Sequence, residues 1–161
     1  MKQFLSIISL FLISFSSQAQ DLNNLLFEKT KDKDFQSFVY VLGKVESNNK
    51  DNIIGDNLMA VGRYQIWESC FLDAQEFSLK NGDCFQLRNL THNFCFNQSV
   101  SYRVLVAYCA RYELKALKDN NFESLARLWN SGPNWRKKKE KTNHYWYKIK
   151  LELHNQIKEN T

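Results

Sequence analysis

The sequence predicts a mainly α-helical domain with about five helices and one small β-hairpin between the first two. Apolar residues recur at helical spacing in several segments. One proline and five glycines leave few places where a helix must stop. A single tract rich in turn formers, residues 47–57, separates the first two helical segments. No repeat, linker or low-complexity tract divides the chain, whose length fits one domain.

The periodic segments set the expected boundaries of these elements. The first helix is expected from Asp34 to Glu46, and a short irregular hairpin follows within residues 53–66. Asn81-Gly82-Asp83 is a typical end for the second helix, and Asn121 and Thr142 are typical N-caps for the last two. The remaining helices are expected over residues 68–79, 98–117, 122–129 and 143–158.

The first residues of the chain have the pattern of a secretory signal peptide. Lys2 precedes an apolar run from Phe4 to Phe15, and small and polar residues follow up to Ala19. That run is shorter than the roughly 20 residues needed to span a bilayer, which makes a membrane anchor the weaker alternative. We therefore expect a signal peptide at residues 1–19, a single domain at residues 20–161, and a secreted or periplasmic location.

The cysteines and histidines indicate whether the chain forms disulfides or binds a metal. Four cysteines in such a chain favour two disulfides, although the sequence leaves their three possible pairings open. A zinc site is the alternative, but there is no Cys-x-x-Cys pair and the three histidines are scattered. We expect no metal and no cofactor. The disulfide candidates are Cys70, Cys84, Cys95 and Cys109.

The net charge of +5 is concentrated in one basic stretch, from Arg136 to Lys141. Such a stretch raises the local affinity for polyanions. Export argues against nucleic acid, so anionic cell-wall polymers or membrane surfaces fit better. A solvated basic loop that binds nothing is the alternative.

Glu46 lies where the apolar face of the first helix would otherwise continue. Phe38, Leu42 and Glu46 recur at four-residue spacing, so the carboxyl group falls on the buried face. Burial disfavours the charged form and raises the pKa of a carboxyl group. A carboxylic acid that is protonated near neutral pH can donate a proton to a leaving oxygen. The alternative is a solvent-facing side chain in a fraying turn.

Cleavage of a glycosidic bond commonly uses a second carboxylate beside the acid. Asp56 follows Glu46 across the polar turn and could face it over a groove. Asp51 and Asp73 are further candidates, and ordinary turn chemistry explains any one of them alone. Four tryptophans offer flat apolar faces that suit sugar rings, although some of them are expected in the core: Trp67, Trp129, Trp135 and Trp146.

Four short segments, in order, resemble the signatures of the lysozyme-like superfamily. They are Glu46-Ser47, Ile54-Gly55-Asp56, the stretch AVGRYQI at residues 60–66 and the stretch LARLWNSGPN at residues 125–134. The sequence is most similar to invertebrate-type (destabilase-like) lysozymes and their bacterial relatives, and more distantly to soluble lytic transglycosylases. The resemblance covers roughly residues 35–150. It implies an α+β lysozyme-like fold with a groove between the hairpin and the helices.

The resemblance also implies roles for individual residues. Glu46 would be the general acid, and Asp56 falls near the second acidic residue of invertebrate-type lysozymes. Gly62 would let the backbone turn tightly against the sugar, while Tyr64 and Gln65 would line the cleft. Each of them also has an ordinary structural explanation, in the core or in the backbone hydrogen bonds.

A second part of the implied site lies near the C-terminus. Asn130, Gly132 and Pro133 match the family's Asn-Gly-Gly-Pro turn, where Asn130 would contact substrate or position the acid. Ser131 replaces the first glycine of that turn, and serine would be strained if the position required a positive φ. Tyr145 resembles a tyrosine that follows this turn and faces the active site.

These observations lead to one expected function and two alternatives. The expected function is an exported, monomeric muramidase that cleaves the linkage between N-acetylmuramic acid and N-acetylglucosamine in peptidoglycan. The first alternative is a lytic transglycosylase, which forms anhydro-muropeptides with one glutamate and needs no Asp56. The second alternative is a non-catalytic module that binds the cell wall or chitin.

Overall fold

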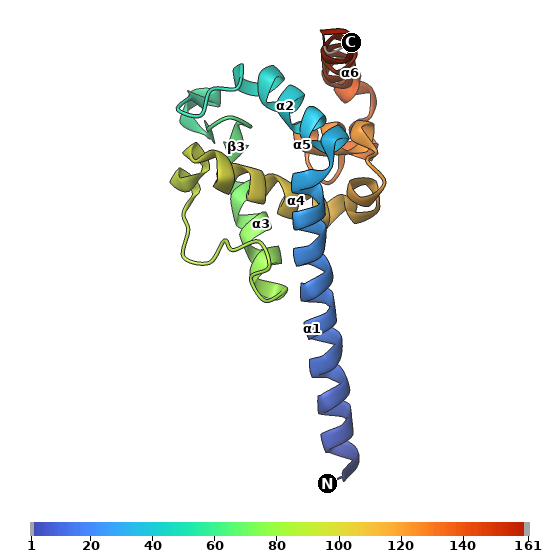
Figure 1. Ribbon diagram of the computed structural model, residues 1–161. Helices are drawn as coiled ribbons and strands as arrows, with labels where there is room; N and C mark the ends of the chain where they lie inside the picture. The colour runs from blue at the N-terminus through green and yellow to red at the C-terminus, as the bar shows by residue number, and fades with distance from the viewer. Residues whose placement is uncertain (1, 160–161) are drawn as a thin grey trace.

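The computed structural model describes residues 2–159, and for residues 2–16 and 159 the description covers the backbone alone. The described chain contains six α-helices, four short 3-10 helices and one three-stranded antiparallel sheet (Figure 1). This confirms the prediction of a mainly helical domain with a small β element. The helix count is higher than predicted, and the sheet lies between the second and third helices because an additional helix precedes the predicted first one.

The additional helix is α1, Lys2–Lys31, whose N-terminal half projects away from the rest of the molecule (Figure 1). Its C-terminal part belongs to the domain, since Leu22 and Leu25 are buried in the core. The side chains of most of the predicted signal peptide, residues 1–19, lie outside the described part of the chain. None of the described helices is long and apolar enough to cross a membrane.

Helix α2, Lys33–Ser47, begins and ends at residues whose side chains favour a helix boundary. Asp32 is the N-cap, and its carboxylate accepts a hydrogen bond from the Phe35 backbone amide. Asn48 follows Ser47 in the left-handed conformation, with φ of 56°, and its amide donates to the Lys44 carbonyl. The helix therefore stops directly after Ser47, and Glu46 lies in its last turn.

The small sheet follows α2 and consists of β1 (Ile54–Gly55), β2 (Ala60–Val61) and β3 (Ile66–Trp67). Ile54 pairs with Val61, and Ala60 pairs with Trp67, in an antiparallel order β1-β2-β3. The 3-10 helix η1, Asp56–Leu58, connects the first two strands. The predicted hairpin is thus extended by a third short strand that leads directly into the next helix.

The remaining helices match their predicted boundaries to within two residues. Helix α4 crosses the middle of the domain and packs against α3 and α5, while α6 packs against α2 (Figure 1). The core between these elements is formed by large apolar side chains such as Leu42, Ile66, Phe71, Leu105 and Leu128. The elements are α3 (Glu68–Lys80), η2 (His92–Phe96), α4 (Gln98–Lys118), α5 (Phe122–Ser131), η3 (Trp135–Lys138), η4 (Glu140–Thr142) and α6 (Asn143–Glu159).

All four cysteines are free thiols in the structure, which differs from the two predicted disulfides. Cys84, Cys95 and Cys109 are buried, and Cys70 is partly buried. Burial raises the pKa of Cys95 to about 12. A buried thiol with such a pKa packs as a small apolar side chain, and these cysteines contribute to the core in that form.

Candidate active site

A cleft of about 620 Å³ lies between the sheet and the helices and contains the groups with candidate chemistry. The end of α2 contributes Glu46, and η1 contributes Asp56. The turn before β3 contributes Gln65, and the end of α5 contributes Asn130. Segments that are far apart in the sequence therefore meet in one cleft, where a polymer chain could lie.

Glu46 is the carboxyl group in the cleft whose acidity the protein shifts. Its side chain is partly buried, and its carboxyl group faces the cleft. Burial raises the pKa of Glu46 to about 7, a hydrogen bond from Tyr145 opposes this shift, and the negative charge of Asp56 adds to it. Glu46 can therefore hold a proton at a pH where an ordinary glutamate has lost it.

Tyr145 connects this acid to the C-terminal helix. Its hydroxyl donates a hydrogen bond of 2.5 Å to Glu46 Oε1. Burial and the neighbouring Glu46 raise the pKa of Tyr145 well above the usual value, so the phenol remains a donor. The ion pair between Lys44 Nζ and Glu152 Oε2, at 2.5 Å, joins the same two helices about two turns further along α6. Helix α6 thus fixes the orientation of the acid.

Tyr145→Phe is expected to move the acidity of Glu46 and weaken its positioning. The lost hydrogen bond stabilises the ionised carboxylate, so the pKa of Glu46 should rise above about 7. We expect the basic limb of the activity profile to shift to higher pH, with a roughly tenfold lower maximal rate from poorer orientation. Tyr147→Phe, on the same helix but exposed, should change neither property. An unchanged pH profile in Tyr145→Phe would contradict this role.

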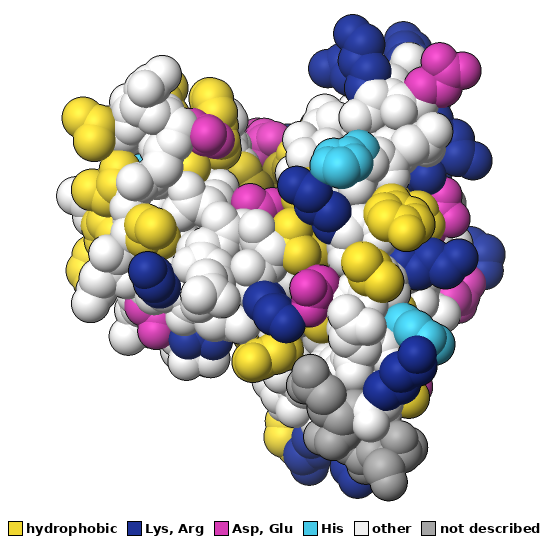
Figure 2. Space-filling view, turned by 90° about the horizontal axis from the view of Figure 1, so that it is seen from above, with side chains coloured by type: hydrophobic (Ala, Val, Ile, Leu, Met, Phe, Trp, Pro, Cys, Tyr) yellow, Lys and Arg dark blue, Asp and Glu magenta, His cyan; other side chains and the backbone are white. Residues whose placement is uncertain are grey.

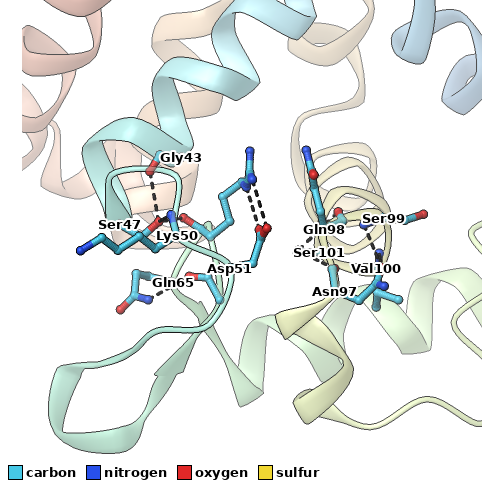
Figure 3. A network of polar contacts seen from close by, with 12 residues as sticks. Gly43, Ser47, Lys50, Asp51, Gln65, Asn97, Gln98, Ser99, Val100 and Ser101 are labelled. Atoms are coloured by element: carbon cyan, nitrogen blue, oxygen red, sulfur yellow. Dashed lines mark hydrogen bonds and ion pairs between the residues drawn. The ribbon is translucent and has the colours of Figure 1, made fainter.

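Ser47 fixes the end of α2 to the sheet. Its hydroxyl lies between three backbone groups, donating to the Arg63 carbonyl at 2.7 Å and accepting from the Lys50 amide at 3.1 Å (Figure 3). The Gly43 carbonyl lies 3.3 Å from the same oxygen. Because Glu46 directly precedes Ser47, these contacts set the distance between the acid and the strands that form the other wall of the cleft.

Asp56 is the one of the three candidate second carboxylates that lines the cleft. Its Oδ2 accepts a hydrogen bond of 3.2 Å from Trp67 Nε1, which holds the exposed side chain beside β3. Asp51 instead forms a bidentate ion pair with Arg63 outside the cleft (Figure 3). Arg63 Nε lies 2.8 Å from Asp51 Oδ1, and Arg63 Nη2 lies 3.1 Å from Asp51 Oδ2. Asp73 accepts a hydrogen bond from Tyr112. These contacts give Asp51 and Asp73 structural roles outside the cleft.

The end of α5 and the residue after it bring Asn130 and Gly132 to the cleft, as the resemblance implied. Gly132 has φ of +76°, a conformation that favours glycine. Ser131 is the last residue of α5 and is not among the residues with positive φ. The expected strain at Ser131 is therefore absent, because the left-handed conformation falls on the glycine that follows.

Gly62 and Tyr64 do not line the cleft, contrary to the expectation. Gly62, with φ of +73°, packs its Cα against the backbone of η2 near the Cys95 carbonyl. The Tyr64 side chain is buried in the core, with 2% exposed. Its backbone carbonyl still serves the site indirectly, because it accepts a hydrogen bond of 3.0 Å from Trp129 Nε1. Tyr64 and Gln65 both lie in the turn between β2 and β3, where Gln65 has φ of +51°. This turn places the Gln65 side chain in the cleft and the Tyr64 side chain in the core.

Several cleft residues were not among the predicted site residues. Trp67 and Trp129 supply aromatic surface, and Trp129 meets Tyr108 edge-on with ring centroids 5.9 Å apart. Trp135, by contrast, is buried, as expected for some of the tryptophans. The periodicity of α4 marks Tyr108 as apolar core and gives no sign that it also reaches the cleft. Ser69 carried no signal in the sequence, Cys70 was a candidate only for a disulfide, and Lys138 was noted only as part of the basic stretch from Arg136 to Lys141.

No protein-family model matches the chain, and no curated protein or solved structure is similar enough to indicate a relationship. The function proposed below therefore rests on the residues of the cleft and on the sequence motifs that they carry.

Proposed function

We propose that this protein is an exported glycoside hydrolase with a lysozyme-like fold that cleaves peptidoglycan between N-acetylmuramic acid and N-acetylglucosamine. The observation that carries the proposal is Glu46, a carboxylic acid with a raised pKa of about 7 in a cleft that also holds a second carboxylate. Two tryptophans and the polar side chains of Gln65 and Asn130 give this cleft the character of a sugar-binding groove.

In this proposal the two carboxyl groups have different tasks because their environments differ. Glu46 is partly buried and protonated, so it donates its proton to the glycosidic oxygen as the bond breaks. Asp56 is exposed and held by Trp67, so its charge stabilises the positive charge that develops on the sugar ring, or orients a water molecule. The mature domain acts as a monomer outside the cytoplasm and requires no cofactor.

Clearing of a bacterial cell-wall suspension tests the proposal. The wild-type protein should lower the turbidity of the suspension, whereas Glu46→Gln should still sediment with the walls but leave the turbidity unchanged. Sedimentation without clearing by the wild type would instead identify a non-catalytic wall-binding module. Ser131, which stands where the family's turn has a glycine, introduces no positive φ in the turn.

Lytic transglycosylase action is a second candidate because one acid, Glu46, could serve first as acid and then as base. Glu46 is the carboxyl group of the cleft that is partly buried and held by Tyr145, and this reaction needs no Asp56, whose side chain is exposed. Mass spectrometry of the products from wild type and Asp56→Asn separates the two reactions. Reducing-end products and a large loss of rate in Asp56→Asn identify the hydrolase, whereas anhydro-muropeptides with little loss of rate identify the transglycosylase.

A further inference from the structure

Lys138 is a cation in the wall of the cleft that the reaction described above does not use. It ends η3 and lines the cleft together with Asn130 and Gly132. Its side chain is exposed, and among the described residues it has no carboxylate within ion-pair distance. It is also the one lysine or arginine among the described residues that line this cleft.

The segment that carries Lys138 is held in place from its N-terminal side. Glu113 is buried where α4 departs from helical geometry, with φ of −142°. Its carboxylate accepts hydrogen bonds from Trp135 Nε1, at 2.9 Å, and from Arg136 Nη2, at 2.9 Å. Arg136 is thereby paired with a buried charge, so it is not available to an external polyanion.

The same segment is also held from its C-terminal side. Arg127 is buried in α5, and its Nη1 donates to the Lys139 carbonyl at 2.8 Å and to Thr142 Oγ1 at 2.7 Å. The backbone between these two anchors is thus fixed to α4 and α5, while the side chains of residues 136–141 are exposed, as in the solvated stretch considered from the sequence. Lys138 is therefore presented to the cleft at a defined position.

We propose that Lys138 binds a carboxylate carried by the glycan strand, as on the lactyl-peptide branch of N-acetylmuramic acid, and thereby favours peptidoglycan over neutral aminosugar polymers such as chitin. This inference rests on the proposed function for the identity of the polymer. An ammonium group without an internal partner forms a charge-assisted hydrogen bond with a carboxylate, whereas a neutral N-acetylglucosamine polymer offers no charge at any position.

The wider charge distribution also favours binding of a negatively charged group on the side of the cleft where Lys138 lies. Lysine and arginine side chains gather on the right-hand side of the molecule in Figure 2, the side where α5 and α6 lie in Figure 1. Glu46 and Asp56 come from the opposite wall, formed by α2 and the sheet. A strand whose carboxylate faces Lys138 would keep that charge away from the Asp56 carboxylate, which would otherwise repel it.

The test compares saccharide binding by three proteins that cannot turn over the ligand: Glu46→Gln alone, and Glu46→Gln combined with Lys138→Gln or Lys141→Gln. Lys141 is the matched control because it is exposed and lies in the same basic stretch but does not line the cleft. Calorimetry would measure the affinity for a muramyl peptide fragment, for the same fragment with amidated carboxylates, and for chitotetraose. Clearing of the cell-wall suspension is measured separately, with proteins that retain Glu46.

Lys138→Gln should weaken binding of the muramyl peptide by about fivefold at low salt and reduce the salt dependence of that binding. Its affinity for the amidated fragment and for chitotetraose should not change, and Lys141→Gln should behave as the parent. Equal losses in both lysine variants, an unchanged muramyl peptide affinity in Lys138→Gln, or no binding at all would overturn the proposal. Selective binding without wall clearing would overturn the proposed catalysis and leave the Lys138 site standing.

Discussion

Replacing Glu46 with glutamine is expected to lower the rate of wall cleavage by about 10²- to 10⁴-fold, the usual contribution of a positioned general acid. Glutamine has nearly the same shape and can still accept the hydrogen bond from the Tyr145 hydroxyl, but it has no proton to donate. The expected loss is therefore in the maximal rate, while wall binding is kept. A variant that retains more than a tenth of the wild-type rate would contradict the role of Glu46 as the acid.

The same substitution should stabilise the protein, with a characteristic dependence on pH. The pKa of Glu46 rises from 4.5 to about 7 on folding, so the folded state binds this proton more tightly than the unfolded state. In the wild type, the associated stability is complete below about pH 4.5 and is lost as the pH rises through 7. Glutamine is neutral throughout, so Glu46→Gln should gain about 2–3 kcal/mol relative to wild type between pH 4.5 and pH 8.

Urea unfolding of both proteins at pH 4.5 and pH 8 measures this difference directly. Glu140→Gln serves as the control, because it also removes one negative charge but from an exposed position outside the cleft. The control should show no comparable gain at pH 8. A difference between Glu46→Gln and wild type that is the same at both pH values would show that the acid titrates normally in the folded protein.

Gly62→Ala is expected to be the most destabilising small substitution in the sheet region, with a loss of about 3 kcal/mol or more. Two costs act together at this position. The φ of +73° is strained for any residue with a Cβ, and a Cβ built there would lie 2.1 Å from the Cys95 carbonyl oxygen. That oxygen belongs to the backbone of η2, so it cannot move aside as a flexible side chain would.

Gly82→Ala separates these two costs. Gly82 has a similar φ of +71°, but a Cβ there would meet only the Ala19 side chain at an ordinary distance of 3.6 Å. Strain alone should cost about 1–2 kcal/mol. Thermal or urea unfolding of both variants should therefore show a loss at least 1 kcal/mol greater for Gly62→Ala. Equal losses would mean that η2 shifts easily and does not fix the sheet.

The helices could be predicted well because their signals are local. Four-residue spacing of apolar side chains, caps such as Asp32 and Asn121, and the glycine after α5 determine where helices begin and end. Helix α1 was missed because its first half looks like a leader peptide. Yet Leu22 and Leu25 have the spacing of a helix face and are buried in the core.

The site was predictable where one side chain broke a local pattern, and less so where it depends on distant contacts. Glu46 interrupts an apolar face, and that interruption is visible in the sequence. The direction of each side chain in the turn between β2 and β3 is not visible in the sequence, so Tyr64 was expected in the cleft but lies in the core. Lys138 reaches the cleft because of anchors in α4 and α5, and no local pattern encodes such contacts.

The contact between Tyr145 and Glu46 spans most of the domain, from the second helix to the last. During synthesis or translocation, Glu46 emerges long before Tyr145 does. A chain that lacks its final helix therefore lacks the hydroxyl that holds the Glu46 carboxyl group in place. In the proposed reaction, the acid is therefore held in its orientation only after the C-terminal helix has been made and has packed against α2.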